Sequence, residues 1–212
     1  MATITTHTGR GSVRATAPLT RWRTVDLLTV AFLGAAFGIA YWGWGLLYEG
    51  PSTALGNLFP PLAAFLYAPW LMAGVVGGLV VRRPGAALLC EVVAAVVEML
   101  PGSQWGFSTL ISGILQGLGA ELAFLILGYG SFGLVAAVFA GALAAPMEAV
   151  YEVYTYYPDW SFGYQVAYVA SFAAGGAVIA GVGGWLITKA LAKAGALNAF
   201  PPGQEERERH AV

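Results

Sequence analysis

Long stretches without a charged residue constrain this chain more than any other feature. Each of the longest holds more than the ~20 residues that a helix needs to cross the ~30 Å hydrocarbon core of a bilayer. They are Leu27–Tyr48, Gly50–Val81, Met99–Ala120, Leu122–Met147 and Trp160–Thr188. Charged residues make up 10% of the chain, against about 25% in soluble domains. A soluble fold is therefore excluded, and an all-α polytopic membrane protein is predicted.

The positions of charges, prolines and glycines divide the chain into six predicted transmembrane helices. Their approximate bounds are 24–48, 60–81, 84–100, 108–128, 132–156 and 163–190. The third is short, about 25 Å at 1.5 Å per residue. Residues 24–193 thus form one membrane domain between two cytoplasmic tails. The 1–23 tail is expected to be disordered, and the 194–212 tail to be solvated.

The basic residues set the predicted orientation. With six spans, all ten Lys and Arg residues fall on one side of the membrane, before the first helix, after the second and after the sixth. The other side carries only Glu49 and Asp159 outside the spans. Because cytoplasmic loops are enriched in Lys and Arg, both termini are predicted to be cytoplasmic.

Several classes of function are excluded by composition. Ten basic and 11 acidic residues give a net charge of −1, too little positive charge for a nucleic-acid face. The single cysteine, Cys90, and two histidines confined to the tails, His7 and His210, leave no metal or disulfide framework. No phosphate-binding loop, catalytic triad or Rossmann pattern is present, so we expect neither an enzyme nor a cofactor.

Five glutamates inside the predicted spans are the strongest candidates for a binding site. They are Glu91, Glu98, Glu121, Glu148 and Glu152. A carboxylate in hydrocarbon normally faces a cavity or a partner, and no Lys or Arg lies inside a predicted span to pair with it, since Lys189 stands at the very end of the sixth. Protonation, a neutral hydrogen bond and placement near the water interface remain open as alternatives.

Spacing brings these glutamates together in pairs. Glu91 and Glu98 are seven residues apart and face one side of a helix. Glu148 and Glu152 are four apart, with Tyr151 on the same side. Two unpaired carboxylates at this spacing repel each other unless a cation or protons lie between them. A cationic ligand and bound protons are equally compatible with the pattern.

Neutral polar and aromatic residues extend the candidate site. Trp105 and Gln104 lie in a compact turn next to Glu98, and Gln116 lies one helix further on. An indole can stack on a ring or a cation, and amides suit heteroaromatic nitrogens. The alternatives are an interfacial aromatic belt for the tryptophan and helix–helix hydrogen bonding for Gln116.

The first predicted helix carries small residues at four-residue steps, which allow a partner helix to approach closely. The pairs are Ala31 with Ala35, Gly34 with Gly38, and Ala36 with Ala40. Packing within the protein's own bundle is the alternative.

A run of polar residues and glycines lies within the membrane pattern. The run is Arg83-Pro84-Gly85-Ala86-Ala87, Glu91, Glu98, Gly102-Ser103-Gln104-Trp105-Gly106, Gly113, Gln116-Gly117 and Glu121. It resembles the YkoE family. Members of that family are substrate-binding (S) components of energy-coupling-factor (ECF) transporters for thiamine or its hydroxymethylpyrimidine precursor. The resemblance implies a six-helix protein of the bacterial plasma membrane with an outward-facing pocket. It also implies a transmembrane coupling (T) subunit and cytoplasmic ATPase subunits as partners, with the small residues of the first helix as the docking surface.

Three functions follow as hypotheses. The first is capture of thiamine or its precursor for a partner-driven ABC importer. The second is a stand-alone carrier of a small cationic solute, coupled to protons or cations through the glutamates. The third is a membrane scaffold, for which replacing Glu91 or Glu121 would do no harm to uptake.

Overall fold

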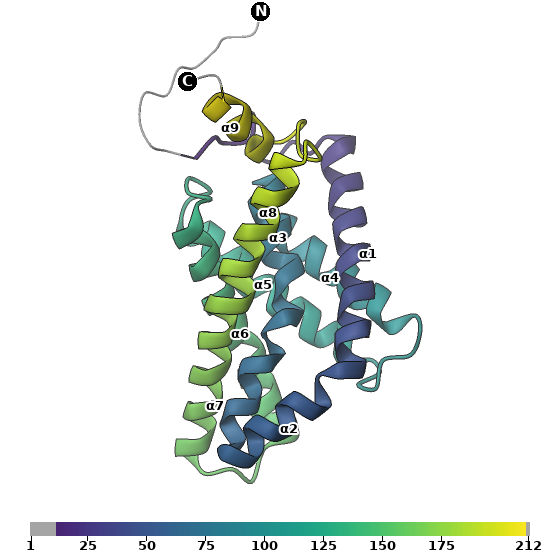
Figure 1. Ribbon diagram of the computed structural model, residues 1–212, viewed down its shortest axis with the longest axis vertical. Coiled ribbons are helices and arrows are strands. Elements are labelled where there is room, and N and C mark those ends of the chain that lie inside the picture. Colours follow the sequence, from purple (N-terminus) through teal and green to yellow (C-terminus); the bar gives the residue numbers. More distant parts are fainter. Residues whose placement is uncertain (1–11, 211–212) are drawn as a thin grey trace, which may run out of the picture.

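The computed structural model describes residues 12–210, and every regular element in that range is a helix (Figure 1). The elements are α1 Thr24–Leu47, α2 Glu49–Leu58, the 3-10 helix η1 Pro60–Leu71, α3 Met72–Val81, α4 Ala86–Met99, α5 Ser108–Ile126, α6 Leu134–Tyr156, α7 Phe162–Gly175, the π-helix η2 Gly176–Val182, α8 Gly183–Lys193 and α9 Pro201–His210.

Within this range, five helical stretches are long and apolar enough to cross a membrane. They are α1, η1 with α3, α5, α6, and the continuous α7–η2–α8. This confirms the all-helical membrane class. The remaining predicted span is α4, which has 14 residues and is only about 21 Å long at 1.5 Å per residue. It packs between α1 and α5, and the count of six full spans stays a prediction.

The sequence pattern did not indicate the breaks inside two of the predicted helices, and it did not predict two short helices. The 60–81 segment begins as a 3-10 helix containing Pro69 and becomes an α-helix only at Met72. Prolines supply no backbone N–H and disfavour a regular α-helix. The last span contains a π-helical turn beginning at Gly176. Helices α2 and α9 occupy stretches that we expected to be a connection and a solvated tail.

Glycine allows two pairs of helices to approach closely. A Cβ added at Gly34 or Gly38 would collide with the α4 backbone or side chains. Likewise, a Cβ at Gly141 or Gly176 would collide with the carbonyl group of the other residue, between α6 and η2. The core at the α6–η2 contact includes five buried alanines of α6: Ala137, Ala140, Ala144, Ala145 and Ala149.

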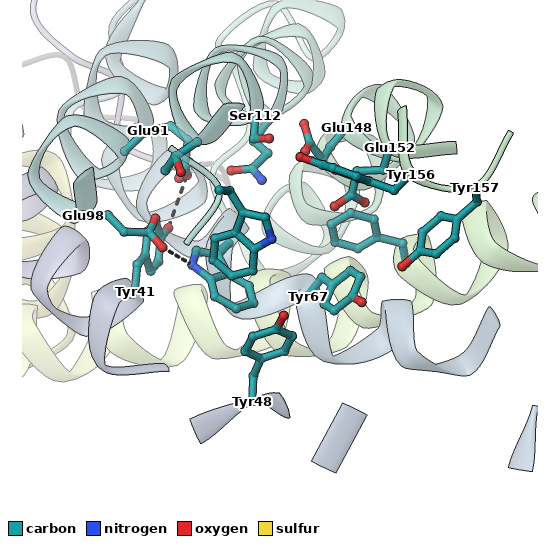
Figure 2. A pocket seen from close by; sticks show the side chains of 16 residues that line it. Tyr41, Tyr48, Tyr67, Glu91, Glu98, Ser112, Glu148, Glu152, Tyr156 and Tyr157 are labelled. Carbon is teal, nitrogen blue, oxygen red and sulfur yellow. Dashed lines mark hydrogen bonds between the residues drawn. The ribbon is translucent and has the colours of Figure 1, made fainter. Parts of the chain in front are cut away.

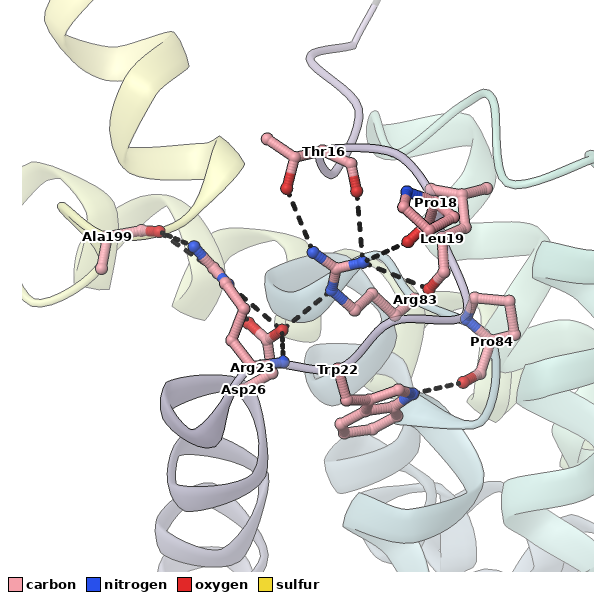
Figure 3. A network of polar contacts seen from close by, with 9 residues as sticks. All are labelled: Thr16, Pro18, Leu19, Trp22, Arg23, Asp26, Arg83, Pro84 and Ala199. Carbon is pink, nitrogen blue, oxygen red and sulfur yellow. Dashed lines mark hydrogen bonds and ion pairs between the residues drawn. The ribbon is translucent and has the colours of Figure 1, made fainter.

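Buried ion pairs tie the N-terminal segment to one end of the bundle (Figure 3). Arg83, which is 2% exposed, donates from Nε to Asp26 Oδ2 at 2.8 Å and from its other nitrogens to Thr16, Pro18 and Leu19. Residues 12–23, expected to be part of a disordered tail, thus contact this end of the bundle, where carbonyl groups of Thr16, Pro18 and Leu19 satisfy a buried guanidinium. Residues 1–11 lie outside the described part.

The adjacent arginine holds the C-terminal helix at the same end. Arg82 forms a bidentate ion pair with Glu205 of α9, with nitrogen–oxygen distances of 2.5 Å and 3.0 Å. It also donates a hydrogen bond to the Val13 carbonyl. The C-terminal segment is thus not simply solvated, because α9 covers this end through a buried charge. The described Lys and Arg residues all belong to segments that meet here: 12–23, the α3–α4 connection, the end of α8, and α9 (Figure 1).

Candidate substrate-binding site

A cavity of about 250 Å³ lies in the half of the bundle opposite these arginines. It is lined by residues of α1, η1, α4, α5, α6 and α7, and of the connections that follow α1, α4 and α6. The residues that line it are Tyr41, Tyr48, Tyr67, Trp70, Glu91, Ala95, Glu98, Trp105, Thr109, Ser112, Gln116, Glu148, Glu152, Tyr156, Tyr157 and Phe172. Figure 2 shows Glu91 and Glu98 on one side, Glu148 and Glu152 on the other, and rings between them.

An aromatic cluster centred on Trp70 forms one wall. The ring centroid of Trp70 lies 5.2 Å from that of Tyr48, 5.3 Å from that of Trp105 and 6.4 Å from that of Tyr67, all in edge-to-face geometry. Such packing fixes ring orientation while leaving faces and edges available to a bound ring. The indole Nε1 of Trp70 also donates to Glu98 Oε1 at 2.8 Å, which orients that carboxylate.

The four cavity glutamates have hydrogen-bond donors but no cation. In the described part of the chain, every ion pair involves other carboxylates, at residues 26, 205 and 206. Glu152 Oε2 accepts a hydrogen bond from the Tyr168 hydroxyl at 2.6 Å. Glu91 and Glu148 are each 1% exposed, and each has one buried oxygen without a hydrogen-bond partner, Oε1 and Oε2 respectively. Such an oxygen is costly unless a ligand or a proton satisfies it.

Glu91 also caps the helix break beside the cavity. Its Oε2 accepts from the Gly74 backbone N–H at 2.6 Å and from the Tyr41 hydroxyl at 3.4 Å. The Ala73 N–H donates to that same hydroxyl at 2.7 Å. These N–H groups belong to the first turn of α3, where a helix has no internal acceptors. The break between η1 and α3 therefore brings a carboxylate to the cavity and satisfies its own backbone donors.

Six of the nine predicted site residues line the cavity: Glu91, Glu98, Trp105, Gln116, Glu148 and Glu152. The other three lie elsewhere. Gln104 is exposed next to Trp105, and the Tyr151 ring packs edge-to-face on Tyr156. Glu121 is at the opposite end of α5 from the cavity.

Glu121 holds the start of α4. Its Oε1 accepts from the Gly85 N–H at 2.7 Å, and its Oε2 accepts from the N–H groups of Ala87 and Leu88. The Tyr129 hydroxyl donates to the same carboxylate, and burial, followed by this hydrogen bond, raises the pKa of Tyr129. Gly85, with φ +87°, adopts the left-handed conformation that favours glycine. Glu121 is thus a side-chain cap of a helix N-terminus.

Replacing Glu121 with alanine should lower stability without weakening ligand binding. Leaving the capped N–H groups unpaired should reduce the free energy of unfolding by about 1–3 kcal/mol. Glu121→Gln keeps an acceptor oxygen and should cost less. Thermal denaturation paired with ligand titration checks this, and a stable Glu121→Ala protein that no longer binds ligand would return Glu121 to the site.

The sequence pattern missed Tyr41, Tyr67, Trp70, Thr109 and Ser112 as cavity residues. Tyr67 and Trp70 flank Pro69, and a proline between aromatic residues in a predicted span is the signal that could have indicated a helix break there. Tyr41 lies on the same helix as the small residues, and its sequence context gives no such signal.

The small residues of α1 separate into two faces. Gly34 and Gly38 are buried against α4, so they pack within this protein rather than offering a surface to a partner. Ala31, Ala36 and Ala40 are exposed, and Ala35 is half-buried. Large apolar side chains lie beside them, with Phe32 at 74% and Ile39 at 66% exposure.

Comparison with known proteins identifies the family. A family model described as "ABC-type cobalt transport system, permease component" matches residues 25–147. The Bacillus subtilis (strain 168) protein named "Putative HMP/thiamine permease protein YkoE" is 30% identical over 190 residues, covering 89% of this chain and 94% of that protein. A solved structure described as "Crystal structure of an S-component of ECF transporter" has a TM-score of 0.82 and 27% identity, covering 90% of this chain and 96% of the other. The chain therefore belongs to the YkoE family and has the fold of an ECF-transporter S component, a multi-pass plasma membrane protein that serves transport and is not an enzyme.

Proposed function

We propose that this chain is the substrate-binding component of an ECF-type importer and that its ligand is thiamine or the hydroxymethylpyrimidine precursor. The observation that carries the proposal is the pairing of four cation-free glutamates with an aromatic wall in one cavity. Thiamine has a permanent positive charge on its thiazolium ring, which suits the carboxylates. Its aminopyrimidine ring suits stacking and hydrogen bonding by Trp70, Trp105 and Gln116.

The acidic lining favours intact thiamine over hydroxymethylpyrimidine, because the precursor lacks the permanent charge. It also favours an organic cation over a metal ion such as cobalt, although the matching family model is described by that metal. A bare metal ion makes no use of edge-to-face rings around Trp70, whereas a heteroaromatic ligand does.

Orientation and partners complete the proposal. The chain crosses the membrane six times if the short α4 is counted as a span, and the basic residues of its described part gather at the end opposite the cavity. By the positive-inside rule, that end and both termini are cytoplasmic, and the cavity faces outward. The exposed face of α1 formed by Ala31, Ala36 and Ala40, with Ala35 at its edge, is then the docking surface for the T subunit, which works with cytoplasmic ATPase subunits.

Calorimetric titration of the purified protein tests the ligand assignment. We expect saturable binding of thiamine, and weaker binding of hydroxymethylpyrimidine. An absence of heat with thiamine, its phosphate esters and hydroxymethylpyrimidine would refute the assignment.

Reconstitution into liposomes separates this proposal from a stand-alone carrier coupled to protons or cations. Thiamine should accumulate only when the T and ATPase subunits and ATP are present. Accumulation by this chain alone under an ion gradient would favour the carrier instead.

A further inference from the structure

The cavity contains more negative groups than its surroundings can balance. Two of its glutamates come from α4 and two from α6. The other titratable groups around the cavity are tyrosines. They are Tyr41 from α1, Tyr48 directly after α1, Tyr67 from η1, Tyr156 and Tyr157 at the end of α6, and Tyr168 from α7, which lies behind Glu152. Helix α5 contributes only the neutral Thr109, Ser112 and Gln116. No Lys, Arg or His of the described chain lines the cavity.

The hydrogen bonds at these carboxylates are too few to balance four negative charges, three on buried side chains and one on the half-buried Glu152. Glu98 has the Trp70 indole and Glu152 has the Tyr168 hydroxyl, but Glu91 Oε1 and Glu148 Oε2 are buried without a partner. An ionised carboxylate away from water and without a counter-charge is very costly, and such a group neutralises instead. Carboxyl groups that share a site hold protons jointly rather than singly. Before ligand binds, the cavity therefore keeps part of this glutamate cluster as neutral carboxylic acid.

Resting on the proposed function, we propose that this cavity exchanges protons for the positive charge of its ligand. Thiamine binds with release of protons from the cluster formed by Glu91, Glu98, Glu148 and Glu152, and a neutral pyrimidine binds without such release. The thiazolium carries no proton of its own to give up. One carboxyl O–H bond therefore breaks heterolytically for each charge delivered, its electron pair stays on the carboxylate, and the proton leaves to solvent.

The direction of the pH dependence follows from this exchange. Because the bound state holds fewer protons than the free state, thiamine affinity rises with pH wherever release occurs, by about tenfold per pH unit for each proton released. The affinity for neutral hydroxymethylpyrimidine stays level over the same range. The exchange thus discriminates cationic from neutral ligands.

Calorimetry in two buffers at one neutral pH measures the exchange directly. Tris and phosphate have very different ionisation enthalpies, so the difference in observed heat gives the number of protons released. We expect about one proton per thiamine, and close to none for hydroxymethylpyrimidine. Buffer-independent heat with normal thiamine binding would overturn the exchange and leave the proposed function intact. Failure of thiamine to bind would overturn both.

Two variants locate the protons. Glu91→Gln keeps an oxygen to accept from the Gly74 N–H, so the fold should persist while fewer protons are released. Glu98→Gln provides a second test of the same kind. Both variants are titrated at a higher protein concentration than the unmodified chain, because losing a cavity carboxylate should weaken thiamine binding. The matched control is Glu49→Gln, at an exposed carboxylate outside the cavity, which should release as many protons as the unmodified protein. Unchanged release in both cavity variants, or reduced release in the control, would contradict the assignment to this cluster.

Discussion

Replacing Glu148 with glutamine should weaken thiamine binding by at least about 30-fold, while the protein remains folded. Glu148 has a buried Oε2 without a partner, and Figure 2 shows its carboxylate pointing into the cavity beside that of Glu152. Removing one member of a buried charge pair typically costs ~2–5 kcal/mol of binding free energy, and the lower figure corresponds to this fold-change. Glutamine has the same shape, so the cavity should not collapse.

Stability distinguishes lost binding from lost folding in this variant. Because Glu148→Gln removes an ionisable group from a crowded acidic cluster, the ligand-free protein should be at least as resistant to thermal unfolding as the unmodified chain. Glu49→Gln is the matched control and should bind thiamine normally. Unchanged thiamine affinity in a folded Glu148→Gln protein would show that this carboxylate does not hold the ligand.

Replacing Ala36 with tryptophan should reduce transporter-dependent thiamine uptake to background, while thiamine binding by the isolated chain is retained. Ala36 is exposed on α1, facing away from the α4 contacts made by Gly34 and Gly38. Close approach of two membrane helices requires small residues at the contact, and an indole prevents it. The measurement is paired: ligand titration of the isolated variant, and co-purification and uptake with the T and ATPase subunits.

A tryptophan placed elsewhere on the lipid-facing surface controls for general effects. Ala174 is also exposed, on α7, and Ala174→Trp should preserve both assembly and uptake. Ala40→Trp should behave as Ala36→Trp does, because both residues lie on one face four positions apart. Full uptake by a folded Ala36→Trp protein would show that this face of α1 does not dock the T subunit.

The clustering of four glutamates was predictable because the chain offers no basic residue inside its apolar stretches. Charge and seven- or four-residue spacing together indicate a shared face, and Glu91, Glu98, Glu148 and Glu152 line one cavity. The helical spans were predictable for the same reason, since uncharged stretches of sufficient length have few other structures available in a bilayer.

The role of Glu121 could not be predicted from such a pattern. Its partners are the backbone N–H groups of Gly85, Ala87 and Leu88, and backbone donors leave no trace in side-chain spacing. The same holds for Tyr41, whose hydroxyl meets the Ala73 N–H only because η1 changes to α3 at that point. The contacts of residues 12–23 and of α9 could not be predicted either, because they depend on the burial of Arg82 and Arg83, which the sequence pattern does not reveal.

A structure of this chain determined with thiamine bound would show directly whether the glutamate-lined cavity holds the cationic ring. We expect thiamine inside the cavity, with its thiazolium ring next to at least one of the glutamates that have an unpartnered oxygen, Glu91 or Glu148. Its pyrimidine should lie against the Trp70–Trp105 wall. Thiamine bound elsewhere, or with its thiazolium distant from all four cavity carboxylates, would refute the assignment of this cavity as the binding site.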